Sequence, residues 1–344
     1  MITVAKDSTG DFTSIQAAVD SIKSTPEIIY IKNGIYNERV EIRLDNVTLK
    51  GESAKDTIIT NNYYARMIMD DGIKRGTFRS YTFFVNANHF RASDITFENS
   101  SGFGLDVGQA VAVYAEGDDI HFKNCRMLGH QDTLFTGPLP LKEKEPGGFT
   151  GPTEFAKRIP GRQLYEDCYI CGEIDFIFGS ATAYFENCVI ESLCHTTNVN
   201  DIQGYITAAS TPESQEYGYV FSNCKLISKD CPPNSVYLGR PWRNYAKTAF
   251  LECALGNHIH ECGFHDWKKE DARNTVLYAE YRNYPASSAD TTSNNRSLND
   301  DIHCIDGRCI PYPHRAEYVC ELDAVQAEHF SKENVLSGAD HWNP

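Results

Sequence analysis

The stretch AYFENC (183–188) recurs with variations along the chain, and this repeat decides the fold. Each copy alternates larger apolar residues, continues with a polar residue and ends in Cys or Ser; alternation with a period of two is typical of a β-strand. The copies are ITFENS (95–100), IHFKNC (120–125), QLYEDC (163–168), AYFENC (183–188), YVFSNC (219–224) and TAFLEC (248–253). Their ends lie 25, 43, 20, 36 and 29 residues apart. A base period of about 20–25 residues with irregular additions indicates a solenoid in which each turn forms one rung.

Two features of the repeat predict how the rungs are joined. An asparagine precedes the cysteine at Asn124, Asn187 and Asn223, which suits a tight bend because Asn tolerates left-handed backbone geometry. The longest interval contains the segment 136–161, whose Pro, Gly and Lys content predicts an inserted surface loop. Inserted loops on one face of a solenoid often line a binding cleft.

The two ends of the chain differ from the middle. Residues 11–22 carry apolar side chains at helical spacing, so we expect a helix that caps the N-terminal end of the solenoid. Residues 287–301 are polar and predict a loose loop, and the tail 302–344 is expected to hold a short helix in the first half of 324–338. We expect one domain over residues 1–344.

Composition bounds the function. The chain has 344 residues and a net charge of −15, which argues against nucleic acid because that binding relies on Lys and Arg neutralising phosphates. No apolar stretch approaches the roughly 20 residues of a membrane helix, so no membrane partner is expected. The residues after Met1 lack a charged segment followed by an apolar one, the pattern of a signal peptide.

The twelve cysteines bear on the compartment. Five of them, Cys125, Cys168, Cys188, Cys224 and Cys253, end copies of the repeat, which predicts stacked, buried, free thiols. Reduced thiols and the missing signal pattern predict a cytoplasmic protein. The alternative is a secreted protein whose signal peptide is absent from this sequence, in which Cys304, Cys309 and Cys320 of the irregular tail would be the first candidates for disulfide pairing.

Four unusual polar segments fall in the central rungs. They are GQAVAVYAEGDD (108–119), GHQDTLF (129–135), GEIDFIFGSA (172–181) and LGRPWR (238–243). Asp175 lies in an apolar run and needs a partner, since burying an unpaired charge is unfavourable; Arg240 is the best candidate, because its planar guanidinium can hold a carboxylate in one orientation. Taken alone, Asp175 or Asp132 would be interpreted as a structural residue at the end of a rung, with its carboxylate accepting hydrogen bonds from backbone N–H groups. Four such segments that stacking brings together favour a functional site.

These segments resemble the pectin methylesterase family. GQAVA, QDTL, DFIFG and LGRPW occur here in the order and spacing of the family's motifs, and the N-terminal GDFTSIQAAVDSI, NGIYNERVEI (33–42), GNHIHECGFHDW (256–267) and the tail VLSGADHWNP also fit. The resemblance therefore covers nearly the whole chain. It implies an all-β fold, the right-handed parallel β-helix, and a monomeric esterase that acts on methyl-esterified polygalacturonate or oligogalacturonides without a cofactor.

The resemblance also implies roles for individual residues. Asp175 would be the nucleophile that attacks the C6 ester carbonyl, and Asp132 the general acid that protonates methanol and then the base that activates water. Gln109 and Gln131 would donate hydrogen bonds to the oxyanion, and Arg240 would orient Asp175 and keep it ionised. The positions that would contact the sugar chain are Trp242, Phe178 and Thr82.

Other kinds of site and function remain as alternatives. The C-x-x-C of Cys168 and Cys171 lacks the second pair of a zinc site, and the cluster His258, His260, Cys262 and His265 falls in a segment that the family resemblance assigns to packing, so we expect no metal. No G-x-S-x-G motif for a serine hydrolase is present. The rival functions are another pectin-active β-helix enzyme, a polygalacturonase or a lyase, and a β-helix that only binds polysaccharide.

Overall fold

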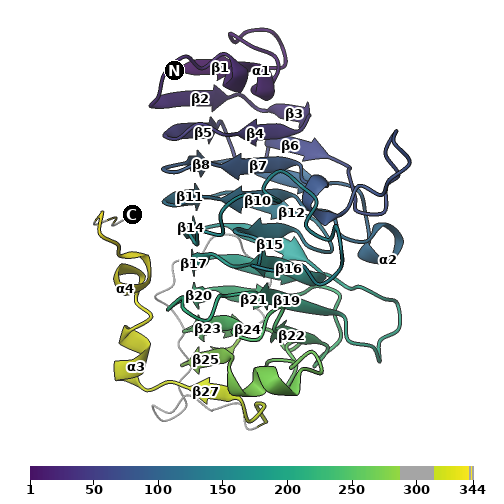
Figure 1. Cartoon of the computed structure of the whole chain (residues 1–344), viewed down its shortest axis with the longest axis vertical. Coiled ribbons are helices and arrows are strands. Elements are labelled where there is room, and N and C mark those ends of the chain that lie inside the picture. Colours follow the sequence, from purple (N-terminus) through teal and green to yellow (C-terminus); the bar gives the residue numbers. More distant parts are fainter. Residues whose placement is uncertain (287–313, 341, 343–344) are drawn as a thin grey trace.

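The computed structural model describes residues 1–286, 314–340 and 342, so the loop predicted at 287–301 lies outside the described residues. The chain winds into a column of rungs whose strands form three parallel sheets (Figure 1). This is the right-handed parallel β-helix that the family resemblance implied.

The first sheet has eleven strands, all paired in parallel. They are β1 (Ile2–Val4), β2 (Glu27–Ile31), β5 (Val47–Gly51), β8 (Arg91–Ser93), β11 (Ile120–Lys123), β14 (Arg162–Glu166), β17 (Thr182–Glu186), β20 (Tyr219–Ser222), β23 (Lys247–Leu251), β25 (Leu277–Tyr281) and β27 (Val319–Glu321).

The second sheet has nine strands and the third has seven. The second is β3 (Gly34–Asn37), β6 (Thr57–Asn61), β9 (Thr96–Asn99), β12 (Arg126–Leu128), β15 (Tyr169–Gly172), β18 (Val189–Ser192), β21 (Lys225–Ile227), β24 (Ala254–Leu255) and β26 (Tyr284–Pro285). The third is β4 (Val40–Ile42), β7 (Phe83–Asn86), β10 (Val113–Glu116), β13 (Leu134–Thr136), β16 (Ile174–Gly179), β19 (Gly204–Ala209) and β22 (Val236–Gly239).

Five of the six repeat copies occupy equivalent places in the first sheet, on β11, β14, β17, β20 and β23. The copy ITFENS (95–100) does not, and its assignment to the series was wrong: it forms β9 of the second sheet. The strand of the first sheet in that rung is β8, and Arg126 donates its N–H to Ile95 O (2.9 Å), as Tyr169 does to Cys125 O (2.9 Å). Similar local patterns on neighbouring sheets cannot be told apart without the pairing.

The repeat builds two ladders inside the column. The aromatic residue three positions before each cysteine stacks on the next, with ring centroids 5.4, 4.7, 4.4 and 4.5 Å apart; the rings are Phe122, Tyr165, Phe185, Phe221 and Phe250. The five predicted cysteines are buried, and each is a free thiol in this structure. Asn124, Asn187 and Asn223 have φ of 49°, 55° and 53°, which confirms the left-handed bend before each cysteine.

Short helices lie at the ends of the column and on two of its sides (Figure 1). They are α1 (Ile15–Asp20), η1 (Thr77–Arg79), α2 (Gly104–Val107), η2 (Glu270–Asn274), α3 (Ala324–Glu328) and α4 (Lys332–Leu336). The predicted N-terminal capping helix is present as α1, and Ser14 caps it by accepting from the Ala17 N–H. The tail holds two helices where one was expected: α3 has a capping box at Asp323, and a second helix begins after Ser331.

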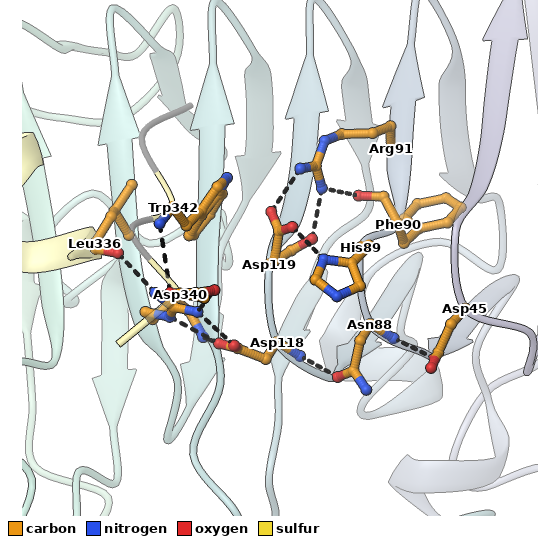
Figure 2. Close-up of polar contacts among 11 residues, drawn as sticks. Asp45, Asn88, His89, Phe90, Arg91, Asp118, Asp119, Leu336, Asp340 and Trp342 are labelled. Atoms are coloured by element: carbon orange, nitrogen blue, oxygen red, sulfur yellow. Dashed lines mark hydrogen bonds and ion pairs between the residues drawn. The ribbon is translucent and has the colours of Figure 1, made fainter. Parts of the chain in front are cut away.

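The C-terminal tail runs back along the first sheet (Figure 1). Arg162 fastens it, because one terminal nitrogen lies 2.6 Å from Asp118 Oδ2 and 2.7 Å from Asp340 Oδ2. Figure 2 shows Asp118, Asp340 and Leu336, which contact Arg162. The Arg162 guanidinium also donates to the carbonyl of Leu336 (3.0 Å). Within the described ranges, no helix has the length and apolar character needed to cross a membrane.

Candidate active site

A cleft of about 420 Å³ lies against the third sheet, where the chain enters β10, β13 and β16. It is lined by Thr77, Phe78, Gln109, Gln131, Asp132, Lys144, Glu145, Gly148, Phe149, Asp175, Phe178, Ala208, Arg240, Trp242, Arg243 and Trp267. Seven of the eight residues predicted from the sequence are in this list, the exception being Thr82. Residues that lie between positions 109 and 242 of the sequence therefore meet in one place.

Parallel pairing is what brings them together. The N–H of Ala110 donates to Gln131 O (3.0 Å), and the N–H of Asp132 donates to Ile174 O (3.1 Å). Gln109, Gln131 and Asp132, and Asp175 therefore occupy three successive rungs. The next strands, β19 and β22, carry Ala208 and lead into Arg240.

Asp175 is held by Arg240 through two parallel hydrogen bonds, which confirms the predicted pairing of these two side chains. Arg240 Nε lies 2.7 Å from Asp175 Oδ1, and Arg240 Nη2 lies 2.7 Å from Oδ2. Burial raises the pKa of Asp175 above its usual range, and the Arg240 guanidinium opposes that rise. A buried carboxylate in this position is oriented by a permanent positive charge.

Arg240 is itself fixed between two aromatic rings. Its guanidinium carbon lies 3.8 Å from the ring centroid of Tyr205 and 3.8 Å from that of Trp267. Stacking on both faces leaves the edge of the planar group to bind Asp175. Neither ring was among the predicted site residues, because nothing in their sequence context connects them to Arg240.

Asp132 differs electrostatically from Asp175. Burial and the nearby Asp175 charge raise the pKa of Asp132 well above its usual range, and Arg240 opposes this only in part. Its side chain makes no hydrogen bond to any residue that the structure describes, and it faces the cleft. Two neighbouring carboxyl groups with different environments suit a protonated acid beside an ionised carboxylate.

Both aspartates have left-handed backbone conformations, with φ of 65° at Asp132 and 51° at Asp175. The pairing of β16 with β19 is irregular between Ile174 and Ile177, so Asp175 lies at a bulge. Bulges of this kind redirect a side chain and are common beside active sites. Here the bulge is at Asp175, whose side chain therefore does not follow the inward and outward alternation of the other residues of β16.

Phe178 and Trp242 form the apolar floor of the cleft. Their ring centroids are 5.8 Å apart in an edge-to-face arrangement, and Phe178 packs on Phe135 of the neighbouring rung at 5.0 Å. Thr82 does not reach the cleft: it is fully buried, and its hydroxyl donates to the carbonyl of Glu98 (2.9 Å). Thr77 and Phe78 of η1 line the cleft instead.

Glu173, two residues before Asp175, is a buried acidic residue that the sequence did not single out. Its Oε1 accepts the Gly104 N–H (2.5 Å), and its Oε2 lies 3.4 Å from His195 Nδ1 and 3.9 Å from His130 Nδ1. Burial raises the pKa of Glu173 to about 7. A Cβ on Gly104 would come within 3 Å of both Glu173 and the Gln131 side chain. The hydrogen bond between Gly104 and Glu173 is therefore adjacent to Gln131, a predicted oxyanion donor.

Side chains that could have suggested a metal site are dispersed. Cys168 belongs to the inner cysteine ladder, whereas Cys171 approaches the Gly129 carbonyl at 4.0 Å. Of the cluster at 258–265, His258 is buried and His260 stacks on Tyr237 with centroids 4.2 Å apart. No group of three or more His, Cys, Asp or Glu among residues 1–286, 314–340 and 342 is arranged to hold a metal ion.

The comparisons with known proteins agree with this geometry. The family model for Pectinesterase matches residues 1–138 and 157–300. A relative from Arabidopsis thaliana, "Probable pectinesterase/pectinesterase inhibitor 13", is 36% identical over 309 residues, which cover 85% of this chain and 44% of the relative. The chain thus spans about half the length of several curated relatives that it matches.

Solved structures show the same fold. Pectin methylesterase PemA from Erwinia chrysanthemi is 28% identical, with a TM-score of 0.76 over 100% of this chain and 98% of that one. A pectin methylesterase in complex with a hexasaccharide gives the same identity, TM-score and coverage. With a family model that matches most of the chain and a relative at 36% identity, this protein belongs to the pectinesterase family.

Proposed function

We propose that this protein is a pectin methylesterase. It removes methyl esters from the C6 carboxyl of galacturonate residues in pectin or its oligomers and releases methanol. The observation that carries the proposal is the paired carboxyl site: Asp175, held by both hydrogen bonds from Arg240, stands beside Asp132, whose pKa is raised well above its usual range. Family membership supports the same activity.

In the first step, Asp175 attacks the ester carbonyl carbon as a nucleophile. The carbonyl oxygen becomes an oxyanion, and the side-chain amides of Gln109 and Gln131 stabilise it by donating hydrogen bonds. The intermediate collapses with cleavage of the bond to the methoxy oxygen. Asp132 transfers its proton to that oxygen, methanol leaves, and the galacturonate carboxyl is joined to Asp175 as an anhydride.

In the second step, Asp132 is ionised and removes a proton from a water molecule. The water oxygen attacks the galacturonate carbonyl of the anhydride, the bond to Asp175 breaks, and the galacturonic acid unit that forms releases the second proton of the water to solvent as it ionises. Asp132 regains its proton and Asp175 its negative charge. Arg240 favours the ionised form of Asp175 at both ends of the cycle.

The shape and lining of the cleft support a saccharide substrate. Trp242, Phe178 and Trp267 offer aromatic surface along the cleft. A similarly folded pectin methylesterase has been solved with a hexasaccharide, which supports binding of oligogalacturonides by this chain. The acidic chain tolerates an esterified stretch of the polymer, whose carboxyl groups carry no charge.

The experiment that tests the proposal is methanol release from methylated oligogalacturonides of increasing length. We expect methanol without new reducing ends and without products that absorb in the ultraviolet. New reducing ends would identify a polygalacturonase, and unsaturated ultraviolet-absorbing ends would identify a lyase. Binding of the oligomers without any of these products would leave only a polysaccharide-binding role.

A further inference from the structure

A buried glutamate lies in the rung next to the oxyanion donor Gln131. Glu173 is fully buried, and strand pairing fixes its backbone on both sides. Its N–H donates to the His130 carbonyl (2.9 Å), and its own carbonyl accepts the Tyr205 N–H (3.1 Å). Because His130 directly precedes Gln131 in the chain, the Glu173 backbone is held beside the turn that carries the donor.

One oxygen of the Glu173 carboxyl holds the segment that packs on Gln131. Glu173 Oε1 accepts the Gly104 N–H (2.5 Å). A Cβ on Gly104 would lie 2.7 Å from Gln131 Cβ and 2.8 Å from Gln131 Oε1, so Gly104 is packed directly against that side chain. The Phe103 ring packs on the His130 ring, with centroids 4.7 Å apart. The start of α2 is therefore clamped at two neighbouring residues.

The other oxygen of this carboxyl has no hydrogen bond to any residue that the structure describes. Glu173 Oε2 faces the Nδ1 atoms of His195 (3.4 Å) and His130 (3.9 Å), which lack a hydrogen-bond partner among the same residues. Buried polar atoms without partners are uncommon in folded proteins and often accompany a catalytic role. Among the described residues, Gly104 thus supplies the one hydrogen bond that fixes the orientation of this carboxyl.

Packing, and not hydrogen bonding, orients the Gln131 side chain. Gln131 lines the cleft, and its side-chain amide makes no hydrogen bond to a residue that the structure describes. Its amide oxygen lies against Gly104, which leaves the amide nitrogen free to donate to an oxyanion. A donor stabilises a transition state best when it is already oriented before the reaction. Movement of Gly104 would therefore weaken the oxyanion site without removing any group from it.

We propose that Glu173 is a positioning residue for the esterase reaction: it binds the Gly104 N–H, holds Gly104 against the Gln131 side chain, and so orients the amide that stabilises the oxyanion. This inference rests on the proposed function and deepens it. Glu173 is absent from the lining of the cleft and touches neither the substrate nor the reacting atoms. Its loss should therefore change kcat and leave KM close to that of wild type.

Two substitutions separate the hydrogen bond from the bulk of the side chain. Glu173→Met keeps the length of the side chain but cannot accept the Gly104 N–H. It should lower kcat for methanol release by about 10–100-fold, part of the effect of an oxyanion donor, with KM within about twofold of wild type. Glu173→Gln keeps an oxygen for the Gly104 N–H, and its new amide nitrogen can donate to His195 Nδ1. It should recover kcat to within about threefold of wild type at about pH 6, because burial raises the pKa of Glu173 to about 7 and the wild-type carboxyl is then mostly neutral.

The matched control is Glu280→Met. Glu280 is also a buried glutamate, but it lies on β25 and binds Arg315 (2.7 Å) far along the column from the cleft. Its replacement costs a buried polar contact as well, so it reports the effect of a lost contact on activity in general. Both kcat and KM should stay at the wild-type values in this variant.

A double-mutant cycle shows whether Glu173 acts through Gln131. In a Gln131→Ala background, Glu173→Met should lower kcat by no more than about threefold, because the donor that it positions is absent. An equal decrease in both backgrounds would overturn the proposal. If Glu173→Met does not fold, Glu173→Asp takes its place: its carboxyl is one methylene too short to reach the Gly104 N–H, so the same pattern is expected.

Nuclear magnetic resonance of the side-chain amides provides a readout that needs no turnover. The chain has seven glutamines, and the Gln131 signal is identified by its loss in Gln131→Ala. This signal should shift or broaden in Glu173→Met and stay unchanged in Glu280→Met. An unchanged Gln131 signal, or a folded Glu173→Met with the kcat of wild type, would overturn the proposal. A wild-type protein that releases no methanol while its Gln131 signal responds to Glu173→Met would instead refute the esterase function and leave the contact standing.

Discussion

Arg240 binds both carboxylate oxygens of Asp175 from a position two strands further along the same sheet, at 2.7 Å for each hydrogen bond. The pair is held in place by the rings of Tyr205 and Trp267 on the two faces of the guanidinium. Asp132 lacks such a partner, so the two carboxyl groups respond differently to burial. This difference is the physical basis for assigning one as nucleophile and the other as acid.

Replacement of the proposed nucleophile tests the mechanism most directly. In Asp175→Asn the amide cannot form the anhydride, so kcat for methanol release should decrease by about 10³ or more. The amide has nearly the shape of the carboxylate and can still accept one hydrogen bond from Arg240, so the variant should fold. Circular dichroism and thermal unfolding check this, and a folded variant with turnover near that of wild type would refute the mechanism.

Gln131 is expected to act on the transition state. Gln131→Ala removes one donor to the oxyanion and should lower kcat by about 10²–10³, with a smaller change in KM. Gln16→Ala, on the capping helix α1 at the N-terminal end of the column, is the control and should leave both constants unchanged. If the Gln131 variant altered KM alone, the residue would bind substrate equally in the ground and transition states.

The pH dependence of kcat/KM should report the two aspartates. Activity should fall at low pH as Asp175 is protonated and at high pH as Asp132 loses its proton, giving a bell-shaped profile. Arg240→Gln removes the positive charge that opposes the effect of burial on the pKa of Asp175. The pKa of Asp175 should therefore rise, and the acidic limb of the profile should move to higher pH by about 1–3 pH units.

Arg240→Lys provides the control for this shift. It restores a positive charge without the two parallel hydrogen bonds, so its acidic limb should lie between those of wild type and Arg240→Gln. An acidic limb that stays at the same pH in all three proteins would show that Arg240 does not govern the ionisation of Asp175.

Glu173 should make the stability of the protein depend on pH. Its pKa is raised from 4.5 to about 7 in the folded state, so its stabilising contribution is complete below pH 4.5 and is lost as the pH rises through 7. Glu173→Gln stays neutral and keeps an oxygen for the Gly104 N–H. Relative to wild type, it should therefore gain up to about 3 kcal/mol in the free energy of unfolding between pH 4.5 and 8, at 1.36 kcal/mol per pH unit.

Chemical denaturation at a series of pH values measures this gain. His130 and His195, whose pKa values burial lowers, lie within 4 Å of Glu173, so the difference between the two unfolding curves reports the loss of Glu173 together with its effect on these two histidines. Glu143→Gln, an exposed change in the inserted segment, should show no such trend. A constant difference across this pH range would mean that Glu173 is ionised throughout.

The sequence by itself determined the solenoid, because its repeat specifies which side chains point inward. An aromatic residue, an Asn that accepts left-handed geometry and a Cys recur together, and in the structure they form the ring ladder, the bend and the thiol ladder. The motifs around Asp132, Asp175 and Arg240 could also be found, since each departs from the apolar alternation of its strand. Stacking of parallel rungs then predicted that they would meet.

Only the tertiary structure decided features that depend on contacts between distant segments. ITFENS matched the repeat locally, but strand pairing placed it in another sheet. Thr82 is fully buried and donates its hydroxyl to the Glu98 carbonyl, and Glu173 meets two histidines from other rungs. Phe149 packs against Trp242 because an inserted loop folds back over the cleft. A local sequence pattern determines whether a side chain points into the column or away from it. Which other side chain it contacts depends on loop closure and on the packing of separate rungs.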